Sequence, residues 1–237
     1  MTHPIPRIAD PYRDVDVIDA HAPRFNQATV GTISLIAVLT GWWPLLTLLA
    51  AQVAIGLRLG RRWCLPCVVY FEFVQPRLGE GPIEDSRPPR FANYIGLAVL
   101  GAATVAYVAG QAALGATLGL LVATLALLAA ATGFCAGCFL YRVVARMRGI
   151  RTTRLDRLAM DELGLADIGR GEHVVAFTHP LCTDCHSLID NLSAAGRRVR
   201  TIDVRDRPDL ARKYGVAVVP MAFAVDERGM VLARVAG

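Results

Sequence analysis

Two long stretches without charge constrain this chain more than any other feature. Residues 25–57 and 91–141 contain no Asp, Glu, Lys or Arg, although 19% of all residues are charged. As helices, these runs of 33 and 51 residues would be about 50 and 77 Å long, against a bilayer hydrocarbon core of about 30 Å. Each run is therefore too long to cross a membrane once and long enough to cross it twice.

Helix breakers divide both runs. The sequence Gly-Trp-Trp-Pro interrupts the first at 41–44, and Gly110, Gln111 and Gly115 interrupt the second. The sequence thus predicts four transmembrane helices in two hairpins, at 26–41, 44–60, 92–110 and 114–134. The expected fold class is mainly α, a four-helix transmembrane bundle of two parallel hairpin repeats, followed by a small α/β domain.

Basic residues indicate the orientation. All but one of the 25 are arginines, and they lie before the first hairpin, between the hairpins and after the second, whereas the hairpin tips carry no charge. By the positive-inside rule, both termini and everything after residue 142 are expected in the cytoplasm. We expect no signal peptide, because the polar N-terminal residues lack an apolar segment. Topology and an anionic lipid surface explain the net charge of +5, so no nucleic-acid partner is expected.

An internal repeat supports the two hairpins. Pro-Arg-Phe opens the first at 23–25 and the second at 89–91, and each hairpin ends in a Cys-x-x-C sequence. The copies have the same direction, so both thiol pairs should emerge on the cytoplasmic face. Asn26 and Asn93 follow the two openings, either as caps or structural amides of the entering helices or as partners in a hydrogen bond across the bundle.

All six cysteines belong to Cys-x-x-C sequences. This spacing places two sulfurs on one helical turn, where they can form a disulfide, pass one on, or chelate a soft metal. The three pairs are Cys64 with Cys67, Cys135 with Cys138, and Cys182 with Cys185.

Hydropathy and periodicity suggest four regions. They are an N-terminal cytoplasmic segment (1–24), the transmembrane domain (25–147), a linker with an amphipathic helix at 153–165 (148–169), and a C-terminal domain (170–237). Residues 74–90, rich in proline and glycine, read as an ordered loop or linker. In the last domain the pattern predicts strands at 173–178, 199–204, 221–225 and 230–235, and helices at 182–195 and 208–214.

The C-terminal domain resembles the thioredoxin fold. The resemblance is carried by HVVAFTHPLCTDC and by YGVAVVPMAFAVDERGMVLARVAG, in that order. It implies that Cys182 is the attacking thiolate, Cys185 the resolving thiol and Pro220 a cis-proline beside them, in a domain without the usual closing helix. A position at a helix N-terminus would also lower the pKa of Cys182 and leave it exposed for attack. Ala176 and Leu181 depart from the usual acidic residue and tryptophan, which argues against general thioredoxin activity.

The N-terminal half resembles an uncharacterised bacterial four-helix membrane family that is often fused to thioredoxin-like domains. The matching motifs are PRFNQ, WCLPCVVYFE, PPRFAN and GFCAGCFLYR, within about residues 15–147. The resemblance implies a multi-pass protein of the bacterial inner membrane and supplies no established activity.

Three functions fit the sequence. The favoured one is a membrane thiol-disulfide oxidoreductase without a resident cofactor, in which the C-terminal pair exchanges disulfides with the membrane pairs and with protein partners. The alternative is a zinc or soft-metal site for binding or transport, made by Cys64, Cys67, Cys135 and Cys138. In the third, the membrane cysteines are inert and only the soluble domain works. All five histidines lie outside the apolar runs, which argues against a haem or quinone site.

Overall fold

The computed structural model describes residues 9–152, 158–163, 171–216 and 218–236. The chain forms two compact units. The helical unit comprises Asp10–Pro82 and Ser86–Tyr141, and the α/β unit comprises the described residues after Tyr141 together with the short segment Ile83–Asp85. Helices account for 59% of the chain, which confirms the mainly α class, with a small sheet near the C-terminus.

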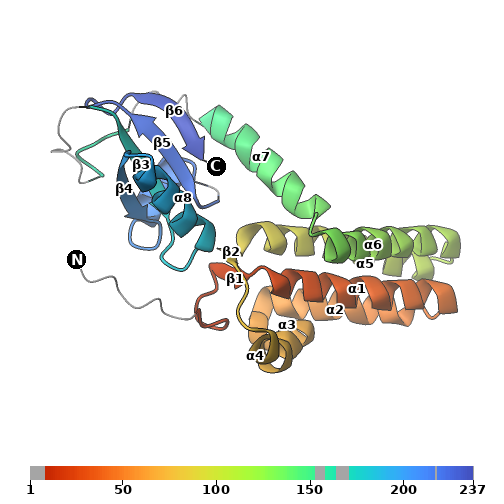
Figure 1. Ribbon diagram of the computed structural model, residues 1–237. Helices are drawn as coiled ribbons and strands as arrows, with labels where there is room; N and C mark the ends of the chain where they lie inside the picture. The colour runs from red at the N-terminus through yellow and green to blue at the C-terminus, as the bar shows by residue number, and fades with distance from the viewer. Residues whose placement is uncertain (1–8, 153–157, 164–170, 217, 237) are drawn as a thin grey trace. The chain divides into compact units, whose positions relative to one another are not determined.

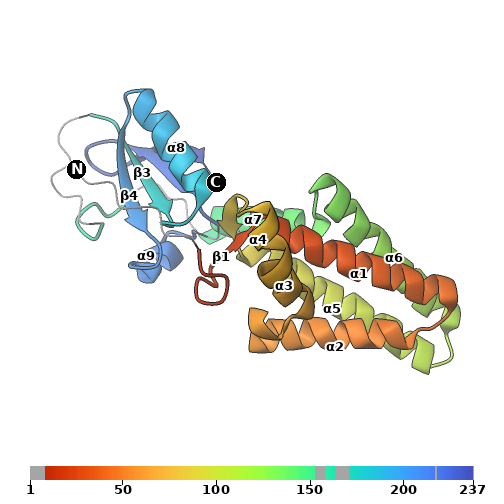
Figure 2. The same ribbon diagram turned by 60° about the horizontal axis from the view of Figure 1, so that its bottom comes forward.

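Four long helices form the body of the helical unit. They are α1 (His21–Thr40), α2 (Pro44–Leu59), α5 (Arg87–Val108) and α6 (Ala112–Thr132). Helices α1 and α5 each pack against both α2 and α6, so the four run side by side (Figures 1 and 2). Their shared core contains Ala37, Leu46, Leu49, Leu100, Ala103 and Val122. All four predicted helices exist, but α1 and α5 begin five residues earlier than predicted.

Tight turns at the predicted breakers join each helical pair. Gly41 ends α1 in the left-handed conformation (φ 71°), and Pro44 opens α2. Gly110, at φ 75°, makes the corresponding turn between α5 and α6. Glycine adopts a positive φ at little cost and proline suits a first helical turn, so these residues account for the hairpins.

Two helices are long and apolar enough to cross a membrane, α5 and α6. Helix α2 is apolar but shorter, and α1 is not among the candidate spans within the described residues. Exposed leucines lie along α6, namely Leu114, Leu120, Leu121, Leu125 and Leu128, as suits a helix in contact with lipid. Membrane association is thus supported by two helices, while four crossings remain a prediction.

Short helices fill the segment between the hairpins. After α2 come η1 (Arg61–Trp63), α3 (Leu65–Val69), the π-helix η2 (Tyr70–Val74) and α4 (Gln75–Leu78). Strand β1 (Val17–Asp19) comes just before α1 in the chain, and strand β2 (Ile83–Asp85) comes just before α5. The prediction of a loop over 74–90 was therefore wrong in part, because prolines 76, 88 and 89 occupy first turns of helices, where their missing N–H costs nothing.

Helix α7 (Ala136–Thr152) was not predicted as one element. It begins within the second Cys-x-x-C sequence, that of Cys135 and Cys138, and continues through Arg142, where we expected the apolar region simply to end. The amphipathic helix predicted for 153–165 falls mostly outside the described residues. Its described part, 158–163, forms a turn, so the helix prediction is wrong there.

The α/β unit is a four-stranded sheet in the order β4-β3-β5-β6. Strand β3 (His173–Thr178) is parallel to β4 (Arg198–Asp203) and antiparallel to β5 (Met221–Val225), which pairs with β6 (Val231–Ala236). Every residue of β3 and β5 is buried, as expected for central strands covered on both faces. Each predicted strand and helix here lies within a residue or so of its observed position.

Helices cover both faces of this sheet. Leu188 and Leu192 of α8 (Thr183–Ala194) pack on Val174 and Ala176, and Leu210 of α9 (Pro208–Lys213) belongs to the core on the other face. Alternate residues of β3 thus feed two cores, which is the period-two pattern of a buried strand.

Candidate functional site

The C-terminal pair lies where β3 gives way to α8. Cys182 is the N-cap of α8, with an extended backbone (φ −81°, ψ 115°), and its sulfur accepts a hydrogen bond from the Cys185 amide at 3.2 Å. The two residues are joined by a disulfide across Cα atoms 5.3 Å apart. This helix-start position is the one the sequence predicted. The Val219–Pro220 peptide bond is cis, as the resemblance implied.

Cys182 is not the exposed thiol that we expected. It is 1% exposed and Cys185 is fully buried, and both belong to the core that also contains Leu210 of α9. His179 is also buried, and its Nδ1 accepts a hydrogen bond from the Leu181 amide. The turn before α8 is therefore held by internal hydrogen bonds, and attack on this disulfide requires local opening.

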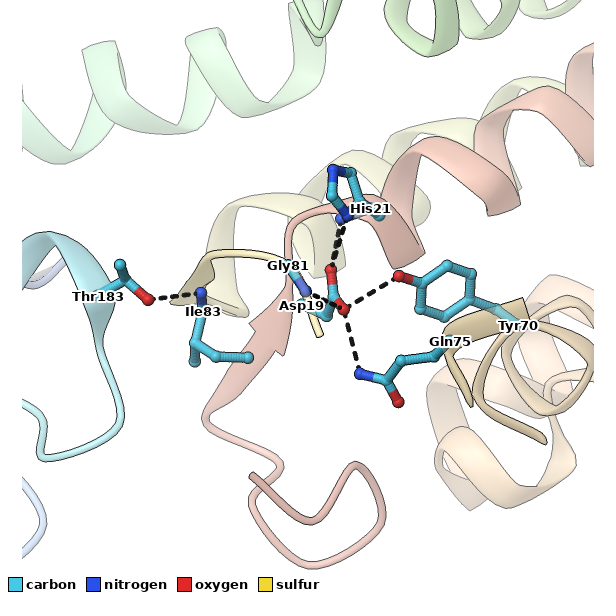
Figure 3. A network of polar contacts seen from close by, with 7 residues as sticks. All are labelled: Asp19, His21, Tyr70, Gln75, Gly81, Ile83 and Thr183. Atoms are coloured by element: carbon cyan, nitrogen blue, oxygen red, sulfur yellow. Dashed lines mark hydrogen bonds and ion pairs between the residues drawn. The ribbon is translucent and has the colours of Figure 1, made fainter. Parts of the chain in front are cut away.

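Strand β2 supplies two contacts next to this pair in the α/β unit. The Ile83 amide donates to Thr183 Oγ1 at 2.9 Å (Figure 3), and the Val219 amide donates to the Asp85 carboxylate at 3.4 Å. Ile83 and Asp85 are each only 6% exposed. The sequence gave no signal for these contacts, because a three-residue strand between prolines and glycines lacks periodicity.

The Cys64–Cys67 pair is also a disulfide, with Cα atoms 5.2 Å apart. Both residues are half-buried rather than sealed. Helix α2 approaches closely here, because a Cβ placed on Gly56 would lie 3.0 Å from the Cys64 Cβ. The glycine therefore lets the cysteine segment fold back against the end of α2.

Arg61 fixes the segment just before this disulfide. Its guanidinium donates to four backbone carbonyls of the N-terminal segment, at 2.7–3.3 Å. These acceptors belong to Pro11, Asp14, Val15 and Val17. Burial, and then the positive charge of Arg90, lower the pKa of Arg61 to about 10. The guanidinium still carries its charge at neutral pH.

A buried carboxylate ties the other side of the same segment to α1. Asp19, 2% exposed, accepts hydrogen bonds from the Tyr70 hydroxyl, the Gln75 amide group and the Gly81 backbone amide at 3.0–3.1 Å (Figure 3). The His21 backbone amide donates to it at 2.8 Å. Four donors satisfy an anion that would otherwise be costly to bury.

The remaining pair, Cys135 and Cys138, consists of thiols. Cys135 and Cys138 are half-buried and are not joined to each other, and the Cys138 amide donates to the Cys135 sulfur at 3.3 Å. The hydrogen bond from the Cys138 side chain is the largest influence lowering the pKa of Cys135 to about 6. The backbone amides of Cys138 and Gly137 and the Gln27 side chain act in the same direction. These hydrogen bonds favour the thiolate of Cys135 over its thiol, and the thiolate is the form that attacks disulfides.

Two cavities of the helical unit, which share several lining residues, lie beside its two cysteine pairs. The larger, about 310 Å³, is lined by Cys64 and Cys67, and the smaller, about 130 Å³, by Cys135. Both are also lined by Asn26, Gln27 and Asn93. Asn26 Nδ2 donates to Asn93 Oδ1 at 3.4 Å. Of the roles that the sequence left open for these two residues, the structure therefore shows the hydrogen bond across the bundle. An amide cluster thus separates a disulfide from a dithiol.

The described residues contain no group of three or more His, Cys, Asp or Glu side chains placed to hold a metal ion. In particular, Cys64 and Cys67 are bonded to each other and not gathered with Cys135 and Cys138.

A helical domain with two similar hairpins, each followed by a Cys-x-x-C pair, defines the class to which this chain belongs. The family model described as a domain of unknown function (DUF4395) matches residues 18–146. This is more than half of the chain, so the protein belongs to the DUF4395 family. The expected resemblance of the N-terminal half to an uncharacterised family is thereby confirmed. No curated protein and no solved structure matched the chain.

The lowered pKa of Cys135 predicts a characteristic pH profile. Alkylation of Cys135 by iodoacetamide should reach half its maximal rate near pH 6, because the thiolate reacts and the thiol does not. In Cys138→Ala, which removes the largest stabilising contact, the midpoint should move up towards the ordinary value of about 8.5. Mass spectrometry of the modified peptide over pH 5–9 measures both. A wild-type rate that rises only above pH 8 would contradict this assignment.

Proposed function

We propose that this protein is a membrane-bound thiol-disulfide oxidoreductase in which the α/β unit and the membrane-domain pairs exchange disulfides. The observation that carries the proposal is the chemistry of the three pairs. Two are disulfides, and the remaining one is a dithiol whose first sulfur, Cys135 Sγ, accepts hydrogen bonds that favour its ionised form. A chain with both an activated dithiol and disulfides contains the nucleophile and the electrophile of the same reaction.

We further propose that the α/β unit is a thioredoxin-like domain. Strand β3 leads into a Cys-x-x-C that opens α8, a cis-proline precedes β5, and β5 and β6 form the final hairpin. These features support the assignment of Cys182, Cys185 and Pro220 to the redox site of that domain.

The exchange is balanced within the chain. The Cys135 thiolate attacks one sulfur of the Cys182–Cys185 disulfide, and the other sulfur leaves as a thiolate. Cys138 then loses its proton and displaces the mixed disulfide, so that Cys135–Cys138 is oxidised and Cys182 and Cys185 hold two electrons and the proton. The reduced pair can reduce Cys64–Cys67 by the same two steps, or a disulfide of a protein partner. No resident cofactor is required.

Covalent attachment favours these encounters. A tethered domain reaches its target at an effective concentration of about millimolar when the linker permits contact. Exchange between the units therefore needs no extensive docking surface.

The orientation that we propose places all three pairs on the cytoplasmic side of a bacterial inner membrane. It rests on the arginines outside the apolar runs and on the uncharged turns at residues 41–43 and 109–111. In this arrangement α1, α2, α5 and α6 all cross the bilayer, the first two with their polar ends at the interface.

Removing the resolving thiol should trap the exchange. In Cys185→Ser, Cys182 can attack a membrane-domain disulfide but no neighbouring thiol can release the product. We expect a mixed disulfide from Cys182 to Cys64 or Cys135, found by peptide mapping without reductant. The matched Cys182→Ser variant should not give a crosslink with the same partner peptide. Crosslinks made only to other proteins would mean that the helical unit is merely an anchor.

Reporter fusions test the orientation. A reporter that works only in the cytoplasm should be active after residue 236, and one that works only outside should be active within the turn at 41–43. We expect this pattern because arginine-rich segments are retained on the cytoplasmic side of the membrane. Export of the C-terminal fusion would overturn the proposed topology.

A further inference from the structure

The larger cavity of the helical unit combines a reachable disulfide with positive charge. Cys64 and Cys67 line it, as do Arg58, Arg61 and Arg90, and no Asp or Glu is among its lining residues. This contrasts with the C-terminal disulfide, whose cysteines are at most 1% exposed. Of the two disulfides, the one beside this cavity is open to attack by a dissolved molecule.

The cavity also offers hydrogen-bonding groups. Asn26, Gln27 and Asn93 lie on the side shared with the smaller cavity, and Ser86 lies near the start of α5. Amides both donate and accept, so they suit the peptide or carboxyl groups of a small polar ligand. The apolar part of the lining includes Ile18, Val53 and Leu57.

Size and charge restrict the class of ligand. A volume of about 310 Å³ is at the lower end of small-molecule sites and is too small for a folded protein. Arg61 is already engaged by four backbone carbonyls and feels the charges of Asp14 and Asp16. The other two arginines, Arg58 and Arg90, line a cavity without Asp or Glu and favour an anion, because partly buried charges are weakly screened. A neutral lipid carrier would gain nothing from these cations.

We propose that this cavity is the binding site for an anionic low-molecular-weight thiol, which reduces the Cys64–Cys67 disulfide. The inference rests on the proposed function and supplies it with a class of electron donor. Arg58 and Arg90 hold the carboxylates of the thiol, the amide cluster binds its polar backbone, and its sulfur meets the disulfide.

The reaction balances with two thiol molecules. The first, as thiolate, attacks one sulfur of the Cys64–Cys67 bond, forms a mixed disulfide and releases the other cysteine as a thiolate. The second attacks the mixed disulfide and releases the second cysteine. Two thiols are oxidised to one disulfide, and their two protons end on Cys64 and Cys67.

The test compares thiols that differ in charge, using the purified full-length protein in detergent. Reduction of Cys64–Cys67 is followed by differential alkylation with glutathione, neutral 2-mercaptoethanol and cationic cysteamine, at equal thiolate concentrations. We expect glutathione to be at least about tenfold faster than cysteamine and to saturate, a ratio that corresponds to one modest binding interaction. The advantage should shrink in 1 M salt, which screens the arginines.

Substitutions locate the effect. The double variant Arg58→Gln, Arg90→Gln should lose most of the preference for glutathione, whereas Arg77→Gln, an exposed arginine of α4 outside the cavity, should keep it. Thermal unfolding of each variant checks that it is folded, and the salt dependence of the wild type provides a test without any substitution.

Equal rates for the three thiols, or rates that rise linearly without saturation and ignore salt, would overturn the proposal. In the reaction proposed here the dissolved thiol attacks Cys64–Cys67 directly, without passing through Cys182. A rate that is independent of thiol charge, together with a trapped Cys182 crosslink, would therefore refute this site and leave the proposed exchange intact. A charge-dependent, saturating rate without any such crosslink would refute only the exchange.

Discussion

The arrangement of the helical unit depends on the buried carboxylate of Asp19. It lies at the end of β1, just before α1, and collects donors from the π-helix, from α4 and from the loop that follows (Figure 3). Leaving one buried donor without its acceptor costs about 1–3 kcal/mol, so three such contacts from distant segments hold this fold strongly. On the opposite side, Arg61 donates hydrogen bonds to four backbone carbonyls of the N-terminal segment. The first Cys-x-x-C lies between these two anchors, which explains how a segment of one-turn helices can present a disulfide to a defined cavity.

The three cysteine pairs share a spacing and differ in environment, and this difference gives each a distinct chemistry. Around Cys135 the donors of the following turn and of Gln27 stabilise a thiolate. Beside Cys64 and Cys67 there are arginines and open volume, and around Cys182 and Cys185 there is an apolar core. Together these pairs supply the nucleophile and the disulfides of the exchange that we propose. The Asn26–Asn93 hydrogen bond joins equivalent positions of the two repeats, so the separation between the first two environments follows from the repeat itself.

The sequence predicted the parts of this structure that depend on local patterns. Charge-free runs and glycine or proline breakers located four helices, and strand periodicity located the sheet and the hairpin around 226–229. It did not predict the π-helix, α4 or β2, because their stability comes from Asp19 and other distant partners and not from periodicity. The burial of Cys182 was missed for a related reason: a position at a helix start lowers a thiol pKa, but exposure depends on what packs over it. The pairing of Asn26 with Asn93 was visible as an option only because the repeat aligned them.

The central claim is that the C-terminal pair carries electrons between the membrane-domain pairs of one molecule. Time-resolved differential alkylation of all six cysteines, after a substoichiometric pulse of reductant to oxidised full-length protein, tests it most directly. The account predicts that electrons redistribute among the three pairs at a rate independent of protein concentration, and that the double variant Cys182→Ser, Cys185→Ser slows this redistribution by at least about tenfold. Redistribution that is equally fast in the double variant, or that depends on protein concentration, would contradict it.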